Sequence, residues 1–209
     1  KIRTELKNLE FPDVSKQALS KSRQSIHPDL FLSLFNISVD LFYKQLPKRR
    51  TWNGYHLLAV DGSKIELPNS KSNFEFFGEM STYPNTDRLF TSGLASIIYD
   101  VLDDYIVHAS LNPYLTSERT VAKEHIANLE ALEIFTDNSI VIFDRGYYSE
   151  GMFSFFSERN HLCLMRLKSN VKIVKNCKGD TMSILPGNPK SGTEDVKIRV
   201  VEVDLPNGT

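Results

Sequence analysis

Two short apolar stretches that each end beside an aspartate constrain the fold of this chain more than any other feature. The first, LLAVDG, carries Asp61 at its end, and the second, SIVIFDRG, carries Asp144. Apolar runs of this length that are bounded by turn residues predict buried strands. Because charge is costly to bury, a carboxylate at a strand end indicates either a solvated loop or a functional site, and chemistry tends to gather at strand ends.

The order of the predicted elements places both stretches in one sheet. An antiparallel three-stranded unit is followed by parallel strands that helices connect, which matches the ribonuclease H-like arrangement. In that fold the first strand lies beside the strand that follows the first helix of the sheet, so Asp61 and Asp144 are expected to meet at one sheet edge. The predicted helices cover residues 15–25, 28–47, 117–135 and a segment capped by Ser149, and the predicted strands cover residues 55–62, 63–68, 93–112 as a hairpin turning at Asp103–Asp104, 139–144, 161–170 and 196–209.

We therefore predict an α/β fold, a ribonuclease H-like mixed sheet flanked by helices, in three parts. Residues 1–50 form a helical N-terminal segment, residues 51–170 the ribonuclease H-like core, and residues 171–209 the start of a β-rich insertion. Residues 69–92 are polar and contain Pro and Gly, which predicts a long loop. The last strand stops on Asn207-Gly208, a strong hairpin signal with no returning strand after it. The chain is therefore expected to be a truncated piece of a longer protein.

Composition narrows the class of protein. The 209 residues are 41% hydrophobic, typical of a globular chain, and no apolar run is long enough to cross a membrane. The two cysteines have no zinc-like spacing, which favours a reduced, cytoplasmic setting. The net charge is −1, yet residues 44–50 hold four basic and no acidic side chains, and residues 159–178 hold six and none. Such segments are either solvated surfaces or contacts to a phosphate backbone.

Two adjacent carboxylates repel each other unless a divalent cation lies between them. If the topology is correct, Asp61 and Asp144 therefore predict a metal site. Mg²⁺ prefers hard carboxylate oxygens and keeps several waters, so a few carboxylates suffice.

Three segments resemble a known family. LLAVDGSKIELP, SERTVAKEHI and above all IFDRGYYSEGMFSFFSERNHLCLMRLKSN are similar to bacterial insertion-sequence transposases of the DDE class, in the group numbered family four. The Asp-Arg-Gly-Tyr signature, followed about twenty residues later by Arg-Leu-Lys, is the specific part. The resemblance runs from about residue 15 to the end of the chain.

The resemblance implies that Asp61 and Asp144 are the two aspartates of an Asp-Asp-Glu triad that holds two Mg²⁺ (or Mn²⁺) ions. The family's glutamate lies in a Tyr-Arg-Glu-Lys motif beyond an inserted β-rich segment, and no such motif occurs here. Glu150 and Glu158 follow Asp144 too closely to replace it. The third carboxylate is thus expected outside this chain, and the fragment alone is expected to be inactive. The implied activity is cleavage of transposon ends and strand transfer by a homodimer on DNA.

The basic residues near the two aspartates are candidate DNA contacts. Arg145 could pair with a phosphate or with the carboxylate of Asp144. Arg166 and Lys168 have the same parity on a predicted strand, so both are expected on one face, along DNA. Lys64 is a further candidate for backbone contact.

The other polar and aromatic residues nearby have structural interpretations. Tyr147 and Tyr148 could stack or hydrogen-bond at DNA, or pack under the following helix. The remaining candidates are two histidines in apolar surroundings and two charged residues that open a helix, all interpreted as structural: His108, His125, Glu118 and Arg119.

Other functions remain open from the sequence. A catalytically dead DNA-binding relic of a transposase and another ribonuclease H-like nuclease are both compatible with the same elements. An actin-like sugar kinase is weaker, because its phosphate-binding hairpin needs more glycine than Gly62 alone.

Overall fold

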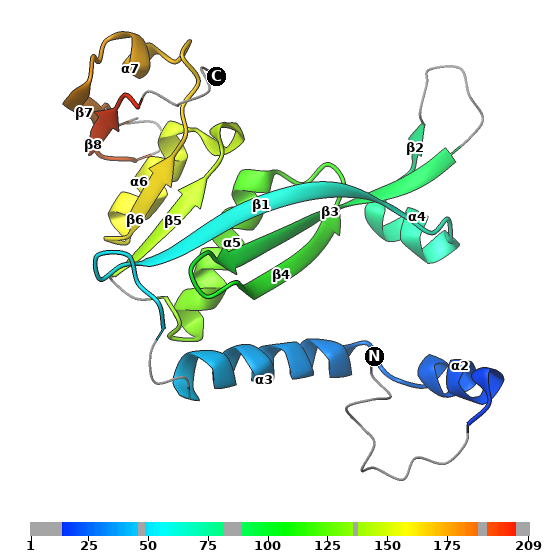
Figure 1. Ribbon diagram of the computed structural model, residues 1–209. Coiled ribbons are helices and arrows are strands. Elements are labelled where there is room, and N and C mark those ends of the chain that lie inside the picture. Colours follow the sequence, from blue (N-terminus) through cyan, green and yellow to red (C-terminus); the bar gives the residue numbers. More distant parts are fainter. Residues whose placement is uncertain (1–13, 46–48, 82–88, 136–137, 188–191, 204–209) are drawn as a thin grey trace. The chain divides into compact units, whose positions relative to one another are not determined.

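The computed structural model describes residues 14–45, 49–81, 89–135, 138–187 and 192–203 (Figure 1). Contacts along the chain divide it into two compact units, Lys1–Pro47 and Lys48–Thr209. None of the described helices is long and apolar enough to span a lipid bilayer.

The described part of the first unit, residues 14–45, contains two helices. Helix α2 (Lys16–Gln24) begins after Ser15, whose hydroxyl accepts a hydrogen bond from Ala18 N at 3.1 Å, as the sequence predicts. Helix α3 (Asp29–Gln45) follows at the expected position. Its apolar side chains at helical spacing are largely exposed, and these are Leu30, Leu34, Ile37 and Leu41.

The second unit is built on a six-stranded mixed sheet in which four strands run in the order β3-β1-β5-β6. Strand β1 (His56–Leu67) is antiparallel to β3 (Leu89–Asp100) and parallel to β5 (Ser139–Phe143), which is parallel to β6 (Leu162–Met165). Strands β2 (Met80–Ser81) and β4 (Tyr105–Pro113) both pair with β3. This strand order is that of a ribonuclease H-like sheet, so the predicted fold class is confirmed.

The sheet of this unit is packed against helices (Figure 1). Helix α5 (Glu118–Ala131) packs against β3 and β4, and helix α6 (Glu150–Glu158) packs against β6. Their apolar faces supply much of the core: Val121, Ile126 and Leu129 from α5, and Met152 and Phe156 from α6, are at most 1% exposed. Burying apolar stripes of this kind against a sheet is the main stabilising contribution to such a domain.

The structure corrects two predictions about residues 55–92. The segment predicted as two strands is the single strand β1, because its register with β3 runs unbroken from Leu58 to Leu67. Part of the predicted loop is ordered as helix α4 (Lys71–Phe77) and β2, while residues 82–88 lie outside the described part. Helix α4 begins after Ser70, whose hydroxyl accepts a hydrogen bond from Asn73 N. The polar composition of this segment favours a loop, so the sequence does not predict this helix.

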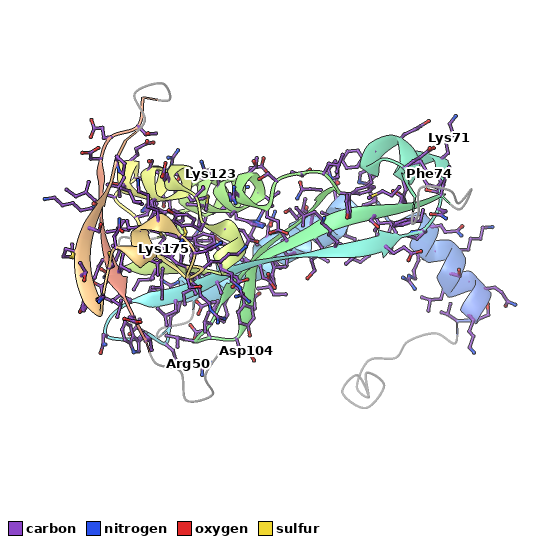
Figure 2. The ribbon with its side chains drawn as sticks, turned by 90° about the horizontal axis from the view of Figure 1, so that it is seen from above. Arg50, Lys71, Phe74, Asp104, Lys123 and Lys175 are labelled. Carbon is purple, nitrogen blue, oxygen red and sulfur yellow. The ribbon has the colours of Figure 1, made fainter. Side chains whose placement is uncertain are left out.

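Strands β1 and β3 continue beyond the parallel part of the sheet. Strand β1 pairs with β5 only through Val60, whereas it pairs with β3 as far as Leu67. Figure 1 shows the two strands running on together to α4 and β2. In Figure 2, Lys71 and Phe74 of α4 therefore lie at the opposite end of the sheet from Arg50 and Asp104.

The hairpin turn and the end of α6 follow the sequence predictions. The β3–β4 hairpin turns through residues 101–104, with Asp104 at a φ of 60°. Asn160, after α6, also has a left-handed backbone, with a φ of 54°, as expected for an asparagine at the end of a helix.

Residues after β6 contain a short helix and a separate two-stranded sheet. Helix α7 (Lys172–Lys175) precedes β7 (Asp180–Leu185), which is antiparallel to β8 (Val196–Val201). Leu185, Val196 and Ile198 form a small core with Phe153 of α6. Strand β8 is shorter than the predicted strand over residues 196–209, and Asn207-Gly208 lies outside the described residues.

Candidate active site

The two aspartates lie on neighbouring parallel strands at the same level. Val60 of β1 is the register partner of Phe143, the last residue of β5; Asp61 is the next residue of β1, and Asp144 is the first residue after β5. Both pairing residues are buried and both aspartates are exposed. The carboxyl ends of neighbouring parallel strands are where α/β folds place ligands. The sheet thus joins two residues that are 83 positions apart in the sequence.

Asp61 is held within the sheet rather than at a free strand end. Its carboxylate accepts a hydrogen bond from Gly62 N at 2.9 Å, and its backbone carbonyl accepts one from the Ser96 hydroxyl at 3.2 Å. Strand β3 fixes its backbone, since Asp61 is the register partner of Ile97.

Ser96 is the end of a buried hydrogen-bonded chain that includes two histidines. His125 of α5 lies with Nε2 3.0 Å from the Ser96 hydroxyl, and its Nδ1 lies 2.6 Å from Nδ1 of His108 on β4. Because the serine hydroxyl donates to Asp61, His125 Nε2–H must donate to the serine, and His108 Nδ1–H to His125. His125 is a core residue, as the sequence predicts, and His108 is half-buried; together they also support the strand that carries Asp61.

This buried chain predicts a pH-dependent stability. Burial, reinforced by the neighbouring His108, lowers the pKa of His125 from 6.5 to about 4. The unfolded state therefore binds more protons between these two pH values, so the free energy of unfolding falls as the pH drops from 6.5 to about 4. A shift of this size corresponds to about 3 kcal/mol. Urea unfolding across this pH range measures the free energy of unfolding. This free energy should depend more steeply on pH in the unmodified chain than in His125→Gln.

His27→Gln is the control, because the His27 side chain is exposed to solvent. Its free energy of unfolding should keep the full pH dependence, since His125 is intact. If His125→Gln does not fold, NMR of the unmodified chain provides the measurement, and His125 should stay neutral down to about pH 4. A His125 ring that becomes protonated near pH 6.5 would contradict the prediction.

Asp144 begins a tight turn that leads into α6. Its carbonyl accepts a hydrogen bond from Tyr147 N at 3.0 Å across a single 3₁₀ turn, Arg145–Tyr147. The Arg119 guanidinium donates to the carbonyl of Gly146 at 3.3 Å, which ties the turn to the start of α5. The structural interpretation of Arg119 is thus supported by its contact.

Three aromatic side chains pack together, one of them on the residue before Asp144. The Phe143 ring lies 5.3 Å from that of Tyr147 and 5.6 Å from that of Phe156 on α6, measured between centroids. Tyr147 is only 2% exposed, so of the two alternatives for this residue the structure favours packing under the helix.

The candidate DNA contacts lie at different points around this edge. Arg145 is exposed in the turn after Asp144. Arg166 and Lys168 follow β6, which ends at Met165, so the prediction that both lie on a strand is wrong. Both are nevertheless exposed, and Arg166 N donates to Phe143 O at 3.1 Å, which places Arg166 beside the strand end that carries Asp144. The Lys64 ammonium lies 3.9 Å from the centre of the Tyr114 ring, a cation–π contact.

The two aspartates suit a hard divalent cation. Both offer exposed carboxylate oxygens, the ligands that Mg²⁺ and Mn²⁺ prefer, and Mg²⁺ retains several waters when few protein ligands are present. Over the described part of the chain, no group of three or more His, Cys, Asp or Glu side chains is arranged to hold a metal ion. The described residues thus offer two neighbouring carboxylates that could bind a cation whose other positions would be taken by water.

The fold and this edge define a class: a ribonuclease H-like domain with paired aspartates beside each other on its central parallel strands. Residues 52–202 match the family described as transposase DDE domain, which is most of the chain. The chain therefore belongs to the transposase DDE domain family.

Two bacterial relatives support this assignment. The chain is 25% identical over 191 residues to the transposase InsG for insertion sequence element IS4 of Escherichia coli K12, covering 86% of this chain and 40% of that protein. It is 26% identical over 101 residues to the putative transposase InsZ of the same organism, covering 48% of this chain and 32% of that protein. The chain thus spans less than half the length of both relatives.

Solved structures with a similar arrangement are transposase complexes. A Mos1 mariner paired-end complex with Mn matches with a TM-score of 0.37 and 11% identity, over 81% of this chain and 51% of that one. A piggyBac transposase synaptic complex with hairpin DNA matches with a TM-score of 0.38 and 13% identity, over 84% and 40%. The fold assignment rests on the strand order of this chain.

Proposed function

We propose that the protein is a DNA transposase that cleaves the ends of an insertion sequence and joins them to target DNA by metal-dependent phosphodiester transfer. The observation that supports this most strongly is the register of β1 and β5, which puts Asp61 and Asp144 side by side within the segment that matches the family. One site can serve both steps, because only the nucleophile changes from water to a DNA 3′-hydroxyl.

Asp61 and Asp144 are the proposed cation ligands. Bound Mg²⁺ or Mn²⁺ would activate the attacking oxygen and stabilise the leaving one. The carboxylates would supply the negative charge that holds the cations, and the hydrogen bonds of Asp61 to Gly62 and Ser96 hold it beside the carboxyl end of β5.

Arg145, Arg166 and Lys168 are the proposed contacts to the DNA backbone. All three are exposed, and Arg145 and Arg166 each lie next to the strand end that carries Asp144. Cations at these positions would neutralise phosphates near the scissile bond. Lys64 is proposed as a fourth contact, which would require it to leave the Tyr114 ring or to bind phosphate beside it.

Three further features extend the proposal to the whole protein. The glutamate of the triad lies outside residues 1–209, so this chain alone is inactive. The active form is a dimer on paired transposon ends. The protein acts in the bacterial cytoplasm. The first feature agrees with the share of the relatives' length that the chain covers.

The test is a strand-cleavage and joining assay with a protein extended past residue 209 by its coding sequence. The substrate is labelled DNA from the borders of the element, with Mg²⁺, Mn²⁺ or EDTA. We expect nicks at the border and joined products with either metal, and none with EDTA or with residues 1–209 alone. Cleavage that persists in EDTA would overturn the proposed mechanism, and binding of border DNA without cleavage at either metal would favour the catalytically dead relic.

A further inference from the structure

The side chain of Glu118 lies against the strand that carries Asp61. Glu118 is the first residue of α5, and its Cγ lies 3.5 Å from the point where a Cβ of Gly62 would be. The Tyr147 hydroxyl lies 3.4 Å from the same point. The Glu118 side chain and the Tyr147 phenol thus both lie close to β1 at the residue that follows Asp61.

The Tyr147 hydroxyl is buried and unpaired. The residue is 2% exposed, and its hydroxyl has no hydrogen-bond partner among the residues that the structure describes. Burial raises the pKa of Tyr147, and the charges of Glu118, Asp61 and Asp144 raise it further, in that order. Buried polar atoms are rarely left without a partner, so this donor indicates a group or water that completes the site.

Glu150 at the start of α6 shows which properties of Glu118 go beyond the usual stabilisation of a helix start by an acidic residue. Glu150 opens α6 directly after Ser149, just as Glu118 opens α5 after Ser117. An acid in the first turn favours the helix dipole in both cases. Glu118 differs because it is half-buried and lies beside Gly62 and the Tyr147 hydroxyl. The interpretation of Glu118 as purely structural is therefore incomplete.

We propose that Glu118 is a further acidic residue of the cation site, and that Tyr147 is a positioning residue whose hydroxyl donates to the group or water that completes the site. This inference rests on the proposed function, because it takes Asp61 and Asp144 as the direct ligands. No described group of three carboxylates is arranged for direct ligation, so Glu118 acts by its charge and through water that Mg²⁺ or Mn²⁺ retains.

The test is the affinity of the 209-residue chain for Mn²⁺ in the absence of DNA. Electron paramagnetic resonance of free Mn²⁺ and calorimetry both measure this affinity. We expect Glu118→Gln to weaken Mn²⁺ binding about 10-fold, the order found when groups around a metal's direct ligands are removed. The matched control Glu150→Gln should change it less than about 2-fold. Thermal unfolding without metal should shift by similar amounts in the two variants, because both lose the same helix-terminal charge.

Tyr147→Phe tests the positioning role. It should weaken Mn²⁺ binding in the unmodified chain but have a smaller effect in the Glu118→Gln background, since the two residues act together. Equal Mn²⁺ affinities of Glu118→Gln and the unmodified chain would overturn the proposal for Glu118, and equal effects of Tyr147→Phe in both backgrounds would overturn the role of Tyr147.

Asp144→Asn separates this inference from the proposed function. Loss of Mn²⁺ binding in Asp144→Asn together with normal binding in Glu118→Gln would overturn only the role of Glu118. Normal binding in Asp144→Asn would overturn the cation site itself and this inference with it.

Discussion

Replacing either Asp61 or Asp144 with asparagine is expected to reduce strand cleavage by the extended protein about 10³-fold or more. Asparagine keeps the shape of the side chain and removes the charge that holds the cations, so the loss falls on the chemical step. Removing a single group that stabilises transition-state charge costs about 10²–10³ in rate, and a direct metal ligand should cost at least as much. Single-turnover cleavage of labelled border DNA is the measurement.

The control for these variants is Glu158→Gln, which removes an exposed carboxylate at the end of α6, away from the strand ends. It should cleave at the unmodified rate. Both aspartate variants should still bind border DNA, because the basic residues are intact. An Asp61→Asn or Asp144→Asn protein that cleaves within about 3-fold of the control would show that the paired aspartates are not the catalytic centre.

Truncating Phe156 to alanine is expected to cause the largest loss of stability by a single substitution in the core. Its ring is 1% exposed and stacks edge-on against Phe143, the residue before Asp144. Removing a buried aromatic ring costs about 3–5 kcal/mol from lost burial and the remaining cavity. Urea unfolding should show this loss. Cleavage should also fall at temperatures where the variant is still folded, because the strand end that carries Asp144 loses its support.

Phe76→Ala is the matched truncation on the surface, since Phe76 of α4 is 64% exposed. It should change the free energy of unfolding by less than about 0.5 kcal/mol. Equal losses in the two variants would mean that α6 does not form the packed core that lies behind β5.

The sequence predicted the parts of the fold that depend on local pattern. Helices α2, α5 and α6 begin within one or two residues of their predicted starts. Ser15 and Ser149 cap α2 and α6, and the start of α5 follows from its apolar residues at helical spacing. The misassigned segments have long-range causes. Gly62 divides an apparent pair of strands, but pairing with β3 carries β1 through it as one strand. Arg166 lies outside β6, since pairing with β5 ends at Met165.

For the candidate site, the sequence by itself identified Asp61, Asp144 and the nearby cations as candidates, because an apolar run leads into each aspartate. That pattern marked a strand end at Asp144, whereas pairing with β3 carries β1 past Asp61 to Leu67. Only the tertiary structure decided which groups meet there. Glu118 has the same local pattern as Glu150, a serine followed by an acid at a helix start, and nothing in that pattern distinguishes them. The difference arises from the packing of α5 beside Gly62 and Tyr147, and local sequence does not encode contacts between residues so far apart along the chain.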